Sequence, residues 1–455
     1  MAVTRSGFTQ VVGNAFAGFG FSPEGPTVYE FPMEMFLPES DLTPINENID
    51  KIVYGLTKWE PKIKEKGIVT PPKVTVEGKD YEEAVANMNL LSLRNMWSDG
   101  LPILPATEER VNWILTGTDL PPDTAIGKIL PRGGLATVES LAVCLAMAGG
   151  RPDYLPVEIA VVEALVKPGL YHQGWQATTN SNNPVVIVNG PIAKQIRLNS
   201  GYGCLGPDPA HPAGATIGRA LRLLLMDLGG AIPGVGTMAI HGTPGRYTNV
   251  VFAEDEDGLP AGWEPLSVER GSPPGSNTVT MVDVNSAINL SGGSTTTEDV
   301  AKTQLTKWAQ VMRTPGYGQP HYDPFNPKGT PGVLLMARGS AQGLGNLGWS
   351  KDKTKSFLWE ATTLTPAEVE KYGLQRTVEQ LKLPPGSPLP LAPSAKNLLL
   401  VVAGGSQSGH GYWMSIMAND AEVVTAEIKL PAKDKWDALL KQAETDLGPL
   451  PPPMQ

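Results

Sequence analysis

The chain has 455 residues and a formal net charge of −10 at pH 7. A chain of this length exceeds what one hydrophobic core usually supports, so two or three subdomains are expected. The acidic balance argues against nucleic acid as a partner, because binding phosphates needs concentrated Lys and Arg. No apolar stretch approaches the roughly 20 residues of a membrane span, and the N-terminal sequence lacks signal-peptide features. We therefore expect a cytoplasmic protein that does not contact membranes.

The numbers of cysteine, glycine and proline residues narrow the possible classes of protein further. The two cysteines, Cys144 and Cys204, exclude a disulfide framework and a Cys-rich zinc site. Cys144 lies in an apolar segment and is expected to be a buried core thiol. The 50 glycines and 43 prolines are spread along the chain. This distribution indicates many tight loops in a folded, enzyme-like body.

The predicted elements alternate between helices and strands. Residues 1–90 are irregular and Pro-rich, with a helix near 46–59. After them, capping residues and apolar patterns predict helices at 107–115, 136–148, 155–167, 216–228, 295–312, 365–374 and 433–444. Short β-branched runs predict strands at 184–189, 247–254, 277–284, 332–337, 397–403 and 422–430. Thr295 with Glu298, and Thr365 with Glu368, have the spacing of capping boxes.

This alternation predicts the α/β class, with an open, partly parallel sheet and flanking helices. We expect an irregular N-terminal segment at 1–90, an α/β main domain at 91–330 that carries a Gly-rich loop, and a C-terminal α/β subdomain at 331–455. The Pro-rich C-terminal end is expected to be extended or disordered. In such sheets ligands bind beyond the carboxyl ends of the strands.

The Gly- and Pro-rich loop 201–214 precedes the helix predicted from Thr216. Its backbone N–H groups and the helix dipole favour an anionic group. Arg219 and Arg222, three residues apart, could add a guanidinium there or pair with carboxylates such as Asp227. Asn199 and Gly203 would border the same site. The loop lacks the spacing of a dinucleotide or ATPase phosphate-binding motif, and a rigid turn that holds a helix is the alternative.

Three residues are candidates for catalysis. Cys204 lies in this loop close to a helix start, where a thiol pKa can be depressed. His410 follows a buried strand and His241 lies in a predicted loop, so both are candidate general acids or bases. Structural roles are the alternative for each. No histidine spacing predicts a metal site, and the sequence identifies no cofactor.

Amide and hydroxyl side chains flank the predicted strand at 184–189. They could orient a polar substrate by hydrogen bonding, although turn and cap chemistry favours the same residue types. Glu254 closes the following strand, where it could face a cleft. These candidate substrate-binding residues are Thr178, Thr179, Asn180, Asn189 and Glu254.

Several stretches resemble the C-terminal region of bacterial UGSC-type (seleno)proteins. The similarity covers roughly residues 90–430, and its most specific part is "NGP" with the helix entry "ATIGRALRL". That family is named for a selenocysteine- or cysteine-containing motif in an N-terminal domain, and no UGSC or CGSC sequence occurs here. Residues 1–90 echo only the distal part of that domain.

The resemblance implies a subunit of a bacterial hetero-oligomeric oxidoreductase. This chain would bind a small polar or anionic substrate for thiol- or selenol-dependent redox chemistry or reductive bond cleavage. A second protein subunit would supply the redox centre. A self-sufficient hydrolase or lyase that uses a histidine or carboxylate, with or without a metal and as a homo-oligomer, is the first alternative. A non-catalytic binding or scaffold subunit is the second.

Overall fold

The computed structural model describes residues 2–5, 7–18, 21, 28–31, 39–60, 73–313, 331–416 and 423–450. The expected domain boundary at residue 330 and the last five residues of the Pro-rich C-terminal end lie outside these ranges. Every structural statement below concerns the described residues.

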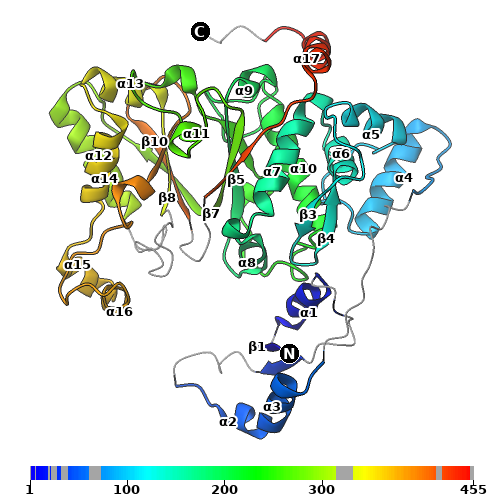
Figure 1. Cartoon of the computed structure of the whole chain (residues 1–455), viewed down its shortest axis with the longest axis horizontal. Coiled ribbons are helices and arrows are strands. Elements are labelled where there is room, and N and C mark those ends of the chain that lie inside the picture. The colour runs from blue at the N-terminus through cyan, green and yellow to red at the C-terminus, as the bar shows by residue number, and fades with distance from the viewer. Residues whose placement is uncertain are drawn as a thin grey trace.

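A mixed, curled sheet of seven strands forms the centre of the molecule, with helices around it, so the predicted α/β class is confirmed (Figure 1). The strand order is β6-β5-β7-β10-β8-β9, and β11 also pairs with β7. The pairs β5/β6 and β8/β9 are parallel, and all other pairs in the sheet are antiparallel. The strands are β5 (Asn183–Asn189), β6 (Val250–Ala253), β7 (Thr278–Ser291), β8 (Gly332–Met336), β9 (Leu399–Val402), β10 (His410–Ile416) and β11 (Val424–Glu427).

The sheet is apolar on both faces. All seven residues of β5 are buried, as its continuous β-branched run predicts. Because side chains alternate along a strand, Val186 and Val188 contribute to one hydrophobic cluster while Val185 and Ile187 contribute to another. The second of these clusters also contains inward side chains of β8 and β9. The two halves of the sheet therefore share an inner core.

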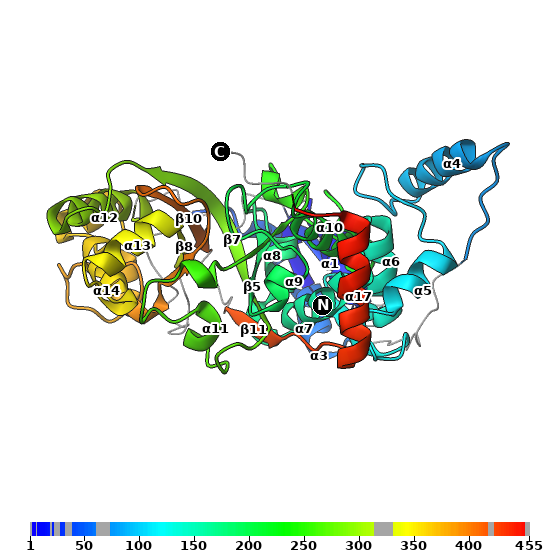
Figure 2. The same cartoon turned by 90° about the horizontal axis from the view of Figure 1, so that it is seen from above.

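Two groups of helices cover the outer face, one on each half of the sheet (Figure 2). The group beside β5 and β6 consists of α5 (Glu108–Leu115), α6 (Val138–Met147), α7 (Leu155–Leu165), α10 (Ala213–Asp227) and α17 (Lys433–Leu447). The group beside β8 and β9 consists of α12 (Glu298–Met312), α13 (Arg338–Asn346) and α14 (Lys351–Ala361). Shorter or peripheral helices are α4 (Tyr81–Arg94), α8 (His172–Ala177), α9 (Ile192–Gln195), α11 (Leu266–Glu269), α15 (Pro366–Lys371) and α16 (Gln375–Gln380), and β3 (Ala125–Ile129) pairs with β4 (Gly134–Thr137).

The curl brings the carboxyl ends of the two parallel strand pairs together. The Asp255 N–H, just after β6, donates to the Val402 carbonyl at the end of β9 at 2.7 Å. The Arg338 guanidinium at the start of α13 binds both Asp255 oxygens, at 2.6 and 2.7 Å. A bidentate pair of this kind is among the stronger ionic contacts in proteins. Strands on both sides of residue 330 thus belong to one sheet.

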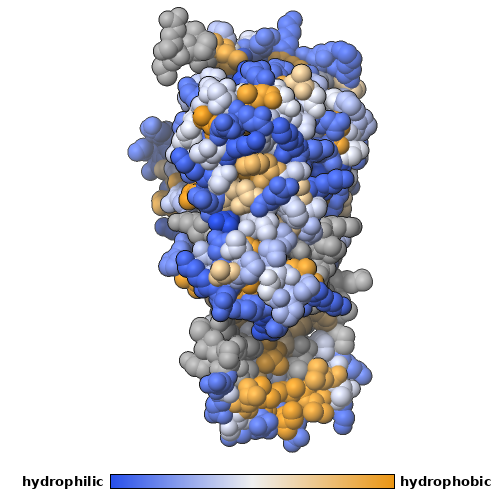
Figure 3. Space-filling model, turned by 90° about the vertical axis from the view of Figure 1, so that its left-hand side faces the viewer, coloured by the Kyte–Doolittle hydropathy of each residue, from blue (hydrophilic) through white to orange (hydrophobic). Residues whose placement is uncertain are grey.

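The N-terminal elements lie below the sheet in the view of Figure 1. They are β1 (Ala2–Arg5), parallel to β2 (Val28–Phe31), with α1 (Thr9–Gly18), α2 (Thr43–Glu47) and α3 (Ile49–Thr57). Apolar side chains gather on their surface at the bottom of Figure 3. The exposed ones on α3 are Ile49, Val53, Tyr54 and Leu56.

Several local signals in the sequence were interpreted correctly, whereas α4, α13, α14 and the β3/β4 pair were not predicted. The Thr107 side chain caps α5, and Thr365 with Glu368 forms the predicted capping box. The box predicted for Thr295 and Glu298 is wrong, because Thr297 caps α12 and Thr295 instead contacts Ser408. Strand β10 was also missed, since its glycine and polar start resembles a loop.

Candidate functional site

The predicted site residues fall at opposite ends of β5. Asn189 closes that strand, and Glu254 follows β6, its parallel neighbour. Residues 178–180 precede β5 and contact the loop that contains His241, where the Ile240 N–H donates to the Thr179 carbonyl at 3.0 Å. The predicted residues therefore do not converge on one site.

At the carboxyl end, Glu254 belongs to a buried ionic network. Its carboxylate accepts hydrogen bonds from the Asn189 side chain at 2.7 Å and from the Leu266 N–H at 2.6 Å. Lys351 Nζ lies 3.8 Å from it and 2.9 Å from the Glu269 carboxylate. Burial raises the pKa of Glu254, with Lys351 acting in the opposite direction. This network joins β6, α11 and α14 and gives Asn189 and Glu254 structural contacts, while their predicted substrate-binding role stays a prediction.

The Gly-rich loop holds itself together through its own side chains. The Asn199 side chain accepts from the Gly201 N–H at 2.8 Å and donates to Asp208 at 3.0 Å. Asp208 in turn contacts His211 Nδ1 at 2.6 Å. The following helix starts at Ala213 instead of Thr216, which lies within its first turn. These contacts agree with the alternative interpretation of this loop, a rigid turn that holds the following helix.

Cys204 and His410 lie away from any described cavity. Cys204, next to Gly203 with its positive φ of 70°, is buried in the inner core. Burial raises the pKa of its thiol to about 12, so the expected depression of this pKa is wrong. His410 opens β10, and its N–H donates to the Ser340 hydroxyl at 3.3 Å.

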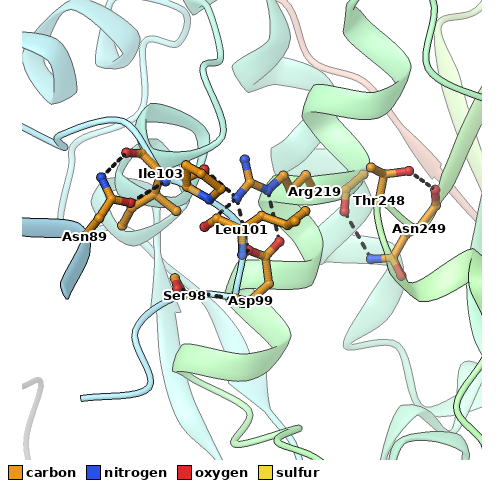
Figure 4. A network of polar contacts seen from close by, with 11 residues as sticks. Asn89, Ser98, Asp99, Leu101, Ile103, Arg219, Thr248 and Asn249 are labelled. Carbon is orange, nitrogen blue, oxygen red and sulfur yellow. Dashed lines mark hydrogen bonds and ion pairs between the residues drawn. The ribbon is translucent and has the colours of Figure 1, made fainter. Parts of the chain in front are cut away.

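Arg219 is occupied by a carboxylate. Its guanidinium donates to both oxygens of Asp99, at 2.9 and 3.0 Å, and also to the Leu101 and Pro102 carbonyls. Figure 4 shows this guanidinium facing Asp99 and Leu101. The structure therefore shows the alternative for Arg219, pairing with a carboxylate, and its role in binding an anionic ligand stays a prediction.

A cavity of about 740 Å³ opens at the other end of β5, beside the His241 loop. This volume lies in the range of sites for small organic ligands. His241 lines it, and so does Arg222, one helical turn beyond Arg219 on α10. We call it the arginine cavity. Its lining residues are Asp99, Gly100, Leu101, Arg222, Pro233, Thr237, Ala239, Ile240, His241, Gly242, Thr243, Pro244, Arg246 and Tyr247.

Two guanidinium groups, of the buried Arg222 and the half-buried Arg246, set the charge of the arginine cavity. Arg222 is 8% exposed, and its Nη1 donates to the Ala231 carbonyl at a long 3.4 Å. Arg246 donates from Nε to the Asn182 carbonyl at 2.6 Å and from Nη1 to the Thr237 hydroxyl at 2.8 Å, while its buried Nη2 has no partner. Among the described residues, no carboxylate lies within 4.0 Å of either group. Burial, and then the charge of Arg222, lowers the pKa of Arg246 to about 10.

Three carboxyl groups lie near this pair, and none forms a salt bridge with it. Asp99 instead forms a salt bridge with Arg219. Burial raises the pKa of Asp283 to about 7, against a hydrogen bond from the Asn182 side chain and the charge of Arg246. Burial also raises the pKa of Asp227 to about 7. A pKa of about 7 leaves Asp227 and Asp283 only partly ionised at neutral pH, so they compensate the charge of the two arginines only in part.

Sequence reasoning named Arg222 only as a companion of Arg219, and it missed Arg246. One signal for Arg222 was present, because it interrupts the leucine-rich run of α10, where an unpaired charge would be costly. Arg246 follows Gly and Pro in a turn and has no such signal. Its role follows only from the loop that folds it against Asn182.

Comparisons with known proteins add no assignment. No protein-family model matches the chain, and no curated protein matches its sequence. Within the described ranges, no group of three or more His, Cys, Asp or Glu side chains is arranged to hold a metal ion. Among the helices described above, none is both long and apolar enough to cross a bilayer.

Proposed function

We propose that this chain binds a small organic anion in the arginine cavity. The observation that carries this proposal is the pair of the buried Arg222 and the half-buried Arg246, which line one cavity and form no salt bridge with a carboxylate among the described residues. A buried charge is stable only when it is paired and hydrogen-bonded. An oxyanion in the cavity would accept from those N–H groups of Arg222 and Arg246 that line it, and it would lower the repulsion between the two guanidinium groups.

An oxyanion suits this geometry better than other ligands do. Arginine presents a planar fork of donors that matches the two oxygens of a carboxylate or the oxygens of a phosphate. The Thr237 hydroxyl and the Asn182 carbonyl hold the Arg246 fork in place before any ligand binds. Such preorganisation reduces the conformational entropy lost on binding.

We further propose that the cavity is the substrate site of an enzyme. Among the predicted catalytic residues, His241 lines the cavity and can exchange a proton with a bound anion. Cys204 and Cys144 are both buried outside the lining, so a thiol that acts on this ligand would come from another chain. That arrangement agrees with the split redox enzyme implied by the family resemblance, whereas His241 alone would serve the hydrolase or lyase alternative.

Binding of acetate and inorganic phosphate, followed by NMR titration of the full chain, tests the anion proposal. Arg246→Gln removes the unpartnered donor and the charge. Loss of a hydrogen bond to a charged group is worth about 1.5–3 kcal/mol, so affinity should fall about 10- to 100-fold. Arg246→Lys keeps the charge without the fork and should lose less.

Arg376→Gln, on the exposed surface of α16, is the matched control because it makes the same change in charge and side-chain length. It should bind both anions as the wild type does. Equal anion affinity in Arg246→Gln and wild type, with both folded by circular dichroism, would refute the proposal.

To separate the two catalytic arrangements, the chain is purified from its own host and analysed by native mass spectrometry. A stoichiometric second chain with a UGSC- or CGSC-like motif supports the split redox enzyme. A homo-oligomer that turns over a substrate alone, and loses turnover in His241→Ala, supports the self-sufficient enzyme.

A further inference from the structure

The arginine cavity is polar at its base and apolar at its rim. Arg222 and the Nη2 atom of Arg246 are buried. By contrast, Ile240 and Tyr247 line the same cavity while remaining 68% and 70% exposed. A ligand that enters therefore meets apolar side chains first and guanidinium groups last.

This exposure is unusual within the described part of the chain. Large apolar side chains that are more than two-thirds exposed there are Leu56, Tyr81, Ile240 and Tyr247. Two of these four border one cavity, together with Leu101, which is 41% exposed. Single exposed apolar residues need no explanation, but their grouping around a concave site marks a binding surface.

The loop that carries these residues fixes which side chains point inward. Backbone hydrogen bonds from Gly242 to Ala239 and from Tyr247 to Pro244 close two successive turns. Gly242 has a φ of 62°, a left-handed conformation that favours glycine. The turns place Arg246 against Asn182 while its neighbour Tyr247 stays on the rim. This short loop thus contributes one charged residue, Arg246, to the base and two apolar residues, Ile240 and Tyr247, to the rim.

The volume of the cavity excludes a good fit to an inorganic ion alone. A cavity of about 740 Å³ has room for a ligand with a body as well as an anionic head. Inorganic phosphate or acetate would fill only the space between the two arginines. The apolar rim would then stay in contact with water.

We infer that the ligand is an amphipathic organic acid, with an oxyanion head between Arg222 and Arg246 and an aryl or short alkyl body against Ile240, Tyr247 and Leu101. This inference rests on the anion-binding function proposed above. It adds the chemical class of the ligand and its orientation, head inward and body at the rim. The tyrosine ring gives an aryl body an additional stacking surface.

Isothermal titration calorimetry of the full chain with acetate, 3-phenylpropionate and the neutral 3-phenylpropanamide tests it. Burial of each methylene is worth about a four-fold gain in affinity, so wild type should bind 3-phenylpropionate at least about 30-fold more tightly than acetate. The amide has the same body without the charge and should not bind measurably. Phenyl phosphate against inorganic phosphate repeats the comparison for a phosphate head and shows which head is preferred.

The double variant Ile240→Ser/Tyr247→Ser removes the apolar rim and should reduce the ratio of the two carboxylate affinities to below about five-fold. Leu56→Ser/Tyr81→Ser makes equivalent changes at equally exposed residues outside the cavity and should keep the wild-type ratio. All four changes are at exposed side chains, so the folded state should survive them.

The outcomes separate the two proposals. If wild type binds none of the acids, or Arg246→Gln binds them equally well, anion binding itself fails. If wild type binds acetate and 3-phenylpropionate with equal affinity, or the Ile240/Tyr247 variant keeps the preference, anion binding stands and the ligand class is wrong.

Discussion

Asp283 on β7 is predicted to make the stability of this protein fall between pH 5 and pH 8. This residue is 3% exposed, and its Oδ1 has no hydrogen-bond partner among the described residues. Burial raises its pKa from 3.8 to about 7, although the Asn182 side chain and the charge of Arg246 act in the opposite direction. Asp283→Asn replaces the carboxyl group with a neutral amide of nearly the same shape.

The sign and size of the effect follow from proton binding. Below pH 3.8 both the folded and the unfolded chain carry a protonated Asp283. Between pH 3.8 and about 7 only the unfolded chain releases this proton, so the folded state loses stability as pH rises until its own pKa is passed. With these two pKa values the loss between pH 5 and pH 8 is about 2.5 kcal/mol.

Urea unfolding of wild type and Asp283→Asn at pH 5, 6, 7 and 8 measures this quantity. The free energy of unfolding of the variant minus that of wild type should rise by about 2.5 kcal/mol over this range. The subtraction cancels the pH-dependent contributions of other buried acids, such as Asp227, to the free energy of unfolding. Asp123→Asn, in an exposed loop, should show a constant difference. A difference for Asp283→Asn that does not vary with pH would refute the reasoning.

Two further predictions concern the centre of the sheet. Because burial raises the pKa of Cys204 to about 12, its alkylation by iodoacetamide at pH 8 should be slow in the native chain and fast in urea. Mass spectrometry of the Cys204 peptide measures the extent of alkylation. Rapid labelling of the native chain would contradict this prediction. Asp255→Asn removes the bidentate contact with Arg338 that links the two halves of the sheet, so it should lower the free energy of unfolding by about 1–3 kcal/mol. The control Glu298→Gln, at an exposed ion pair, should lower it by no more than about 1 kcal/mol. Equal melting temperatures for the two variants would argue against the linking role of Asp255.

Local sequence patterns predicted much of the secondary structure correctly. The run at 184–189 is β-branched and bounded by turn residues, and it forms β5, buried along its whole length. Thr107 and Thr365 cap helices because their side chains bond to N–H groups three residues ahead. Such signals depend on neighbours within a few residues, so a single sequence contains them.

The candidate site was predicted only in part. An anion near α10 was expected from the Gly-rich loop and Arg219, yet the loop is held by Asn199 and Asp208, and Arg219 is neutralised by Asp99. Asp99 is 120 residues before Arg219 in the chain. No local pattern reports such a pairing. The arginine that remains unpaired is Arg222, three residues later on the same helix.

The sequence by itself determined the α/β class, several helix starts and the strands of the central sheet other than β10, because capping, periodicity and β-branching act over one or two turns of chain. Only the tertiary structure decided which charges are neutralised and which are not. Arg219 and Arg222 are equivalent in sequence, but the fold brings a carboxylate to the first and places the second, with Arg246, in the lining of a cavity. Electrostatic compensation depends on distances in space between residues remote in the chain, and it is the basis on which we propose an anion for this cavity.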